Sequence, residues 1–171
     1  MKKIIVKNGL IGGLIVAAVM VCSTFIFMRY PENFDNSMII GFSGMFLAFI
    51  FVFLGIKQFR DKINEGKLSF WEGLKIGLLI ALLTSTIYVV VWMFEYNIFF
   101  PDFAEKYAEY IVKNAKPEEL TEVTKAANEV KDIYKNQLMI FLYTYIEVLP
   151  IGIVFAFISA LILKRKATVQ S

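Results

Sequence analysis

The chain has 171 residues, of which 58% are hydrophobic and 19% charged, and its formal net charge is +3. A single soluble domain of this length could not bury so much apolar surface, so the composition predicts an integral membrane protein. The sequence has no histidine and one cysteine, Cys22, which excludes an imidazole base, a His metal ligand, a Ser-His-Asp triad, an intramolecular disulfide and a Cys-only structural zinc site.

Four long apolar segments predict four transmembrane helices. Their expected ranges are 9–29, 38–57, 74–95 and 138–163. Each is long enough to cross a hydrocarbon core of roughly 30 Å at about 1.5 Å per residue. We therefore expect an all-α integral membrane protein in which residues 1–171 form a single membrane domain.

The distribution of Lys and Arg predicts the orientation of these spans. Eleven lie in the N-terminus, in the loop between the second and third spans and in the C-terminus, where they are Lys164, Arg165 and Lys166. Seven lie on the other side, spread over a longer and acid-rich stretch. Because cytoplasmic segments carry the excess of basic residues, we expect both termini in the cytoplasm.

Small residues recur on one face of each of the first three spans. They are Gly9, Gly13 and Ala17 in the first, Gly41, Gly44, Ala48 and Gly55 in the second, and Gly73, Gly77 and Ala81 in the third. Small side chains let helix backbones approach closely in lipid, so we expect the spans to pack through these faces. The first and third ladders align as Gly-Leu-x-x-Gly-Leu-x-x-Ala, which fits either an internal repeat or chance convergence on a common pattern.

The loop between the second and third spans combines cations with aromatic side chains. The candidate contacts for anionic headgroups at the inner surface are Lys57, Arg60, Lys62, Lys67 and Trp71. Alternatively, these cations are only the topology signal, since Asp61, Glu65 and Glu72 dilute their charge. The expected partner is the lipid bilayer and not nucleic acid, because there is no soluble basic domain.

Residues 97–137 are too long and too patterned for a plain loop. One face of a helix that starts near Pro101 would carry Phe103, Tyr107, Tyr110 and Ile111. This helix either lies at the outer interface or over the bundle, or is an ordinary solvated connector. A second helix is predicted after Pro117, and because no helix breaker follows it, we expect one continuous helix from about Pro117 through the fourth span.

Glu147 is the one ionisable side chain well inside a span, where an unpaired carboxylate costs on the order of a few kcal/mol. It should therefore face protein or water. The candidate intramembrane polar site consists of Glu147, Tyr88, Thr144, Tyr143 and Glu95. A Tyr88–Glu147 hydrogen bond is the simplest pairing, and Glu95 is expected as a solvated carboxylate at the outer interface. Glu147 is either a structural acid, protonated or hydrogen-bonded, or a group that serves transport or binding.

Several sequence segments carry a resemblance to a known family. They are Gly-Leu-Ile-Gly-Gly at 9–13, Gly-Ile-Lys-Gln-Phe-Arg-Asp-Lys at 55–62, Gly-Lys-Leu-Ser-Phe at 66–70 and Ile-Tyr-Val-Val-Val-Trp at 87–92. With the order of spans and the long segment before the last helix, the chain resembles an uncharacterised family of bacterial four-helix membrane proteins, domain-of-unknown-function family 4199. The resemblance implies a multi-pass protein of the inner membrane and no established chemistry.

Three classes of function remain. A non-enzymatic protein that scaffolds or assists a membrane partner fits the small-residue faces and the scarcity of polar groups inside the spans. A small cation- or proton-coupled transporter or channel subunit would use Glu147, but four helices would have to form a homo-oligomer to enclose a pore. An intramembrane enzyme needs at least two cooperating groups. The chain has no histidine and its spans have one deep carboxylate, so we expect no catalytic residues, no metal and no cofactor.

Overall fold

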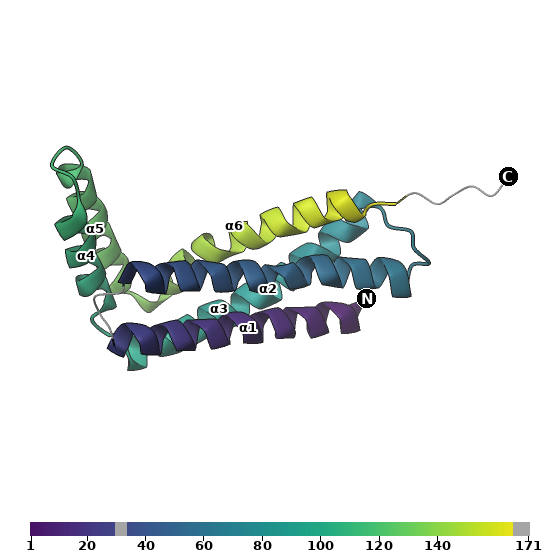
Figure 1. The fold of residues 1–171 in the computed structure, drawn as a ribbon, viewed down its shortest axis with the longest axis horizontal. Coiled ribbons are helices and arrows are strands. Elements are labelled where there is room, and N and C mark those ends of the chain that lie inside the picture. The colour runs from purple at the N-terminus through teal and green to yellow at the C-terminus, as the bar shows by residue number, and fades with distance from the viewer. Residues whose placement is uncertain (30–33, 166–171) are drawn as a thin grey trace. The chain divides into compact units, whose positions relative to one another are not determined.

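The computed structural model describes residues 1–29 and 34–165 and shows six helices (Figure 1). They are α1 (Lys2–Arg29), α2 (Phe34–Lys62), α3 (Phe70–Ile98), α4 (Phe103–Asn114), α5 (Leu120–Tyr134) and α6 (Gln137–Leu163). Within the described ranges there is no strand, and an isolated antiparallel β-bridge joins Leu68 to Arg165. The predicted all-α fold is confirmed.

Four of the helices, α1, α2, α3 and α6, are long and apolar enough to cross a membrane, as predicted. They extend beyond the apolar runs that predicted them. The helix α2, for example, continues to Lys62 and carries Arg60 in its last turn, where cations interact favourably with the helix dipole. Lys166, which contributes to the predicted orientation, lies outside the described residues.

The chain divides into two compact units. Unit 1 comprises α1, α2, α3 as far as Tyr88, and α6 from Glu147 onward. Unit 2 comprises Val89–Ile146, which includes α4, α5, the end of α3 and the start of α6.

Glycines hold the helices of unit 1 close together. A Cβ atom placed on Gly9 would lie 2.6 Å from the Cδ2 atom of Leu83, and one placed on Gly77 would lie 2.8 Å from the Cβ atom of Ala156. Only a residue without a side chain permits these approaches, which confirms that the spans pack through their small-residue faces. Gly41 is an exception, since a Cβ there would meet nothing within 4 Å.

The two ladders that align in sequence face different neighbours. Gly9 and Gly13 on α1 meet side chains of α3, whereas Gly77 on α3 meets Ala156 on α6. A twofold axis that exchanged α1 and α3 would turn the α3 ladder toward α1. The ladders therefore share a sequence pattern but not a packing environment.

In unit 2, α4 and α5 lie side by side (Figure 1) and bury the small residues Ala104, Ala108 and Ala127. An aromatic cluster joins the end of α3 to this pair. The ring centroid of Phe103 lies 5.0 Å from that of Trp92 and 5.4 Å from that of Tyr134. The prediction that the segment after the third span is helical is confirmed.

The expected continuous helix from Pro117 through the fourth span is wrong. The helix α5 ends at Tyr134, and α6 begins at Gln137. Asn136 stands between them, and its Oδ1 atom accepts a hydrogen bond of 2.9 Å from the backbone N–H of Leu138. An asparagine that caps the start of the next helix competes with the helical backbone ladder, and the apolar periodicity does not show this local effect.

Candidate functional site

The predicted intramembrane polar residues are divided between the two units of the chain. Glu147 and Tyr88 belong to unit 1, whereas Tyr143, Thr144 and Glu95 belong to unit 2. Tyr88 is half-buried, but Glu147 is exposed. The expected Tyr88–Glu147 hydrogen bond is absent, and no other residue that the structure describes gives the Glu147 carboxyl a hydrogen bond or an ion pair.

The rotational phase of α6 explains why Glu147 is exposed. The exposed residues that follow it at three- and four-residue spacing, here called the outer stripe, are Pro150, Val154, Phe157 and Leu161. The opposite side of the helix is buried, and a Cβ atom on Gly152 would lie 2.7 Å from Phe49 and 2.8 Å from Ala81. Glu147 therefore lies on the exposed side of α6, away from the helices that pack against Gly152.

The three candidates in unit 2 differ in exposure. Glu95, which we expected to be solvated, is only 3% exposed. Thr144 is also buried and donates a hydrogen bond of 2.8 Å from its Oγ1 atom to the backbone oxygen of Ile140, whereas Tyr143 is 40% exposed. The burial of Glu95 could not be predicted, because the end of a span is solvated only where no later segment folds over it.

Sequence reasoning missed a pair of amides inside unit 1. Asn8 is 1% exposed, and its Nδ2 atom donates to Gln58 Oε1 at 3.1 Å and to the backbone oxygen of Ile4 at 2.9 Å. Its Oδ1 atom has no partner among the described residues. Gly55 makes room for the pair, since a Cβ there would lie 3.3 Å from Asn8 Cγ. The available signal was that Asn8 shares a helix face with Gly12, four residues along.

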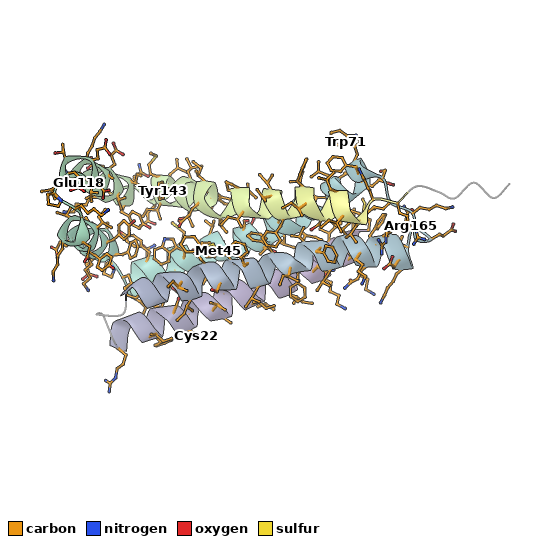
Figure 2. All side chains as sticks on the ribbon, turned by 45° about the horizontal axis from the view of Figure 1, so that its top comes forward. Cys22, Met45, Trp71, Glu118, Tyr143 and Arg165 are labelled. Atoms are coloured by element: carbon orange, nitrogen blue, oxygen red, sulfur yellow. The ribbon has the colours of Figure 1, made fainter. Side chains whose placement is uncertain are left out.

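The predicted headgroup residues gather at one end of unit 1. Arg60 is half-buried, and the exposed members are Lys57, Lys62, Lys67 and Trp71. The end of α6 returns to this loop, because Leu68 N–H donates to Arg165 O at 3.0 Å and Arg165 N–H donates to Leu68 O at 2.8 Å. Figure 2 shows Trp71 and Arg165 at the same end of the unit.

The loop reaches this shape through its own turn residues. Gly66 has a φ of +78°, which favours glycine, and its N–H donates to the backbone oxygen of Arg60 at 2.8 Å. Ser69 and Glu72 then form a capping box at the start of α3. Ser69 N–H donates to Glu72 Oε2 at 3.1 Å, and Glu72 N–H donates to Ser69 Oγ at 3.2 Å.

One carboxylate lies among the cations of this end. Arg60 Nε lies 2.6 Å from Asp61 Oδ1, and both Lys57 and Arg165 also interact electrostatically with Asp61. We call Lys57, Arg60, Asp61 and Arg165 the basic cluster. Its three cations share one acid, so the cluster retains an excess of positive charge.

The sequence predicted Lys57 and Arg60 as members of such a surface but not the arrival of Arg165. Lys67 takes a different partner, Glu65, at 3.6 Å. Across the residues that the structure describes, no three His, Cys, Asp or Glu side chains gather in a way that could hold a metal ion.

The sequence model of a family described as "Protein of unknown function (DUF4199)" matches residues 7–165 of the chain. No curated protein and no solved structure matches it. The matched range contains the glycine contacts, the Asn8–Gln58 pair, the outer stripe and the basic cluster.

Proposed function

We propose that this chain, which belongs to the DUF4199 family of proteins of unknown function, is a non-enzymatic multi-pass membrane protein that scaffolds or assists a membrane partner. Its proposed location is the bacterial inner membrane, with both termini in the cytoplasm, as the distribution of basic residues favours. The observation that carries the proposed role is the exposed position of Glu147 on α6.

An exposed carboxyl inside a membrane is costly, at roughly 3 kcal/mol for a charged side chain near the centre of a span. Lipid tails offer it no hydrogen bond. A second transmembrane helix with a hydroxyl, amide or cationic donor at the depth of Glu147 would offset this cost. The same helix would cover the outer stripe, on which Val154 is 54% and Phe157 48% exposed.

The interior of unit 1 also favours assembly over transport. Its buried polar side chains are uncharged and comprise Asn8, Thr24, Thr84, Ser85 and Ser159. A proton- or cation-coupled transporter normally carries its ionisable group inside the bundle or along a water-filled path. In unit 1 the glycine contacts bring helices together at the backbone, and Glu147 lies on the outside.

Photo-crosslinking in native membranes tests the proposal. A photoreactive residue at Val154 should capture a defined membrane protein, and Glu147→Leu should reduce that capture several-fold. Glu147→Gln should retain it, because an amide both donates and accepts hydrogen bonds. Leu14 is the matched control position. It is an apolar residue of the same unit that is 66% exposed, but it belongs to α1 and not to the outer stripe of α6.

Two results would contradict the proposal. One is equal capture from Val154 and Leu14 with no dependence on Glu147. The other is a proton or cation flux in liposomes that Glu147→Gln abolishes without unfolding the protein, since this outcome supports the transporter alternative.

A further inference from the structure

We propose that the basic cluster is a binding site for the phosphate headgroup of an anionic phospholipid, and that Arg165 completes this site. The proposal concerns the end of unit 1 and does not depend on the proposed scaffolding role.

Charge balance is the first argument. The cations Lys57, Arg60 and Arg165 act on the single carboxylate of Asp61. Three cations around one carboxylate leave an excess of positive charge, so a second anion beside them would be favoured. A phosphodiester suits the position, because an arginine guanidinium can hold two of its oxygens at once.

The side chains and backbone of the cluster are also held in a defined arrangement, which basic residues that only orient the protein in the membrane do not need. A bias in the number of basic residues is enough to orient a membrane protein, and no defined geometry is needed. Here the backbone bridge between Leu68 and Arg165 fixes the end of α6 against the loop. The Arg60 side chain is only 18% exposed and is held by Asp61 and, at 3.5 Å, by the backbone oxygen of Leu163.

The surroundings point to a lipid as the source of the phosphate. Trp71 is 74% exposed in the first turn of α3, and Ile63 is 51% exposed directly after α2, so both flank the loop that carries the Leu68 bridge. Tryptophan prefers the headgroup level of a bilayer, where its ring meets both chains and polar groups. A lipid bound through its phosphate at the cluster would therefore place its glycerol and upper chain near these apolar side chains.

Trp71 provides a direct reporter of such binding. The chain has two tryptophans, so a Trp92→Phe background leaves Trp71 as the single fluorophore. In liposomes, bromine-labelled phosphatidylglycerol should quench Trp71 more strongly than bromine-labelled phosphatidylcholine at equal mole fraction. Arg165→Gln should lower this preference by about tenfold, the effect expected for loss of one charge-assisted hydrogen bond to the phosphate.

The variants distinguish specific binding at the cluster from non-specific attraction of anionic lipid to the protein's positive charge. Arg165→Gln leaves the Leu68 bridge possible, because that bridge uses backbone atoms alone, and Arg165→Lys should keep most of the preference. Lys3→Gln removes the same charge from an exposed residue of α1 in unit 1 and should change the preference little. Thermal unfolding of each variant verifies that it is folded.

Three outcomes would overturn the proposal. One is the absence of any preference for phosphatidylglycerol in the folded parent protein. Another is an equal loss in Lys3→Gln and Arg165→Gln, which would show a general surface potential. The third is displacement of the labelled lipid by inorganic phosphate, which would identify a site for a soluble anion. None of these measurements involves a membrane partner, so the proposed function is unaffected by them.

Discussion

Single residues inside unit 1 make polar contacts whose strength can be measured. Asn8 donates to Gln58 at 3.1 Å from a position that is 1% exposed. Hydrogen bonds between membrane helices contribute about 0.6 to 2 kcal/mol. We predict a coupling free energy in this range for the double-mutant cycle of Asn8→Leu and Gln58→Leu, measured by reversible unfolding in mixed micelles. Strictly additive effects would show that the contact adds no stability.

Glycine positions in the same unit give a second prediction. At Gly77 a new Cβ would lie 2.8 Å from Ala156 Cβ and 3.0 Å from its Cα, so the helices would have to move apart. Gly77→Ala should lower the free energy of unfolding by about 1 to 3 kcal/mol, the usual cost of overpacking.

The matched control for this change is Gly41→Ala, which meets nothing within 4 Å. It should leave stability unchanged or raise it by up to about 1 kcal/mol, because alanine favours a helix interior over glycine. Equal effects at Gly77 and Gly41 would contradict the close-packing argument.

The sequence shows how deep a residue lies in a transmembrane span more readily than it shows whether its side chain points toward the other helices or away from them. The place of Glu147 within an apolar run followed from counting residues, but its exposure depends on the rotational phase of α6. That phase is set by Gly152, which packs against Phe49 and Ala81 from two other helices. The small residues Gly152, Ala156 and Ala160 recur every four residues on the side of α6 away from Glu147, so a small-residue face on the fourth span would have indicated this phase and argued against the expected contact with Tyr88.

At the scale of helices, the interruption between α5 and α6 gives a third prediction. The Asn136 side chain accepts a hydrogen bond from Leu138 N–H at the start of α6. Loss of such a cap costs about 0.5 to 2 kcal/mol. Asn136→Ala should therefore speed amide hydrogen exchange in the first turn of α6, whereas Asn136→Asp should preserve protection because aspartate is an equally good cap. Unchanged exchange in the alanine variant would show that the cap does not hold this end.

The four spans could be predicted because each is a long apolar run, and a helix satisfies every backbone polar group within itself in lipid. The segment between the third and fourth spans was harder to predict. Its helical periodicity indicated α4 and α5 correctly, but the boundary at Asn136 depends on one local hydrogen bond that interrupts an otherwise helical pattern. Similarly, the Ser69–Glu72 capping box explains where α3 begins, several residues before its apolar run.

For the molecule as a whole, the predicted orientation can be tested by labelling. In a Cys22→Ser background, single cysteines at Asn128 and Ser171 would report the two sides of the membrane. A membrane-impermeant maleimide should label Asn128→Cys from outside the inner membrane and label Ser171→Cys only after permeabilisation, because basic segments stay in the cytoplasm. Labelling of Ser171→Cys in sealed cells would reverse the topology.

The bridge between Leu68 and Arg165 also has a consequence for biosynthesis. A ribosome makes the chain from its N-terminus, so the loop of the basic cluster is complete long before the end of α6 exists. The Arg60 guanidinium can donate its hydrogen bond to the backbone oxygen of Leu163 only after that residue, 103 positions later, has been synthesised. A nascent chain that stops inside α6 would insert its first three spans yet lack the closed cluster. Closure of the cluster is therefore a late event in maturation, and a lipid bound there would mark a chain whose translation has passed Arg165.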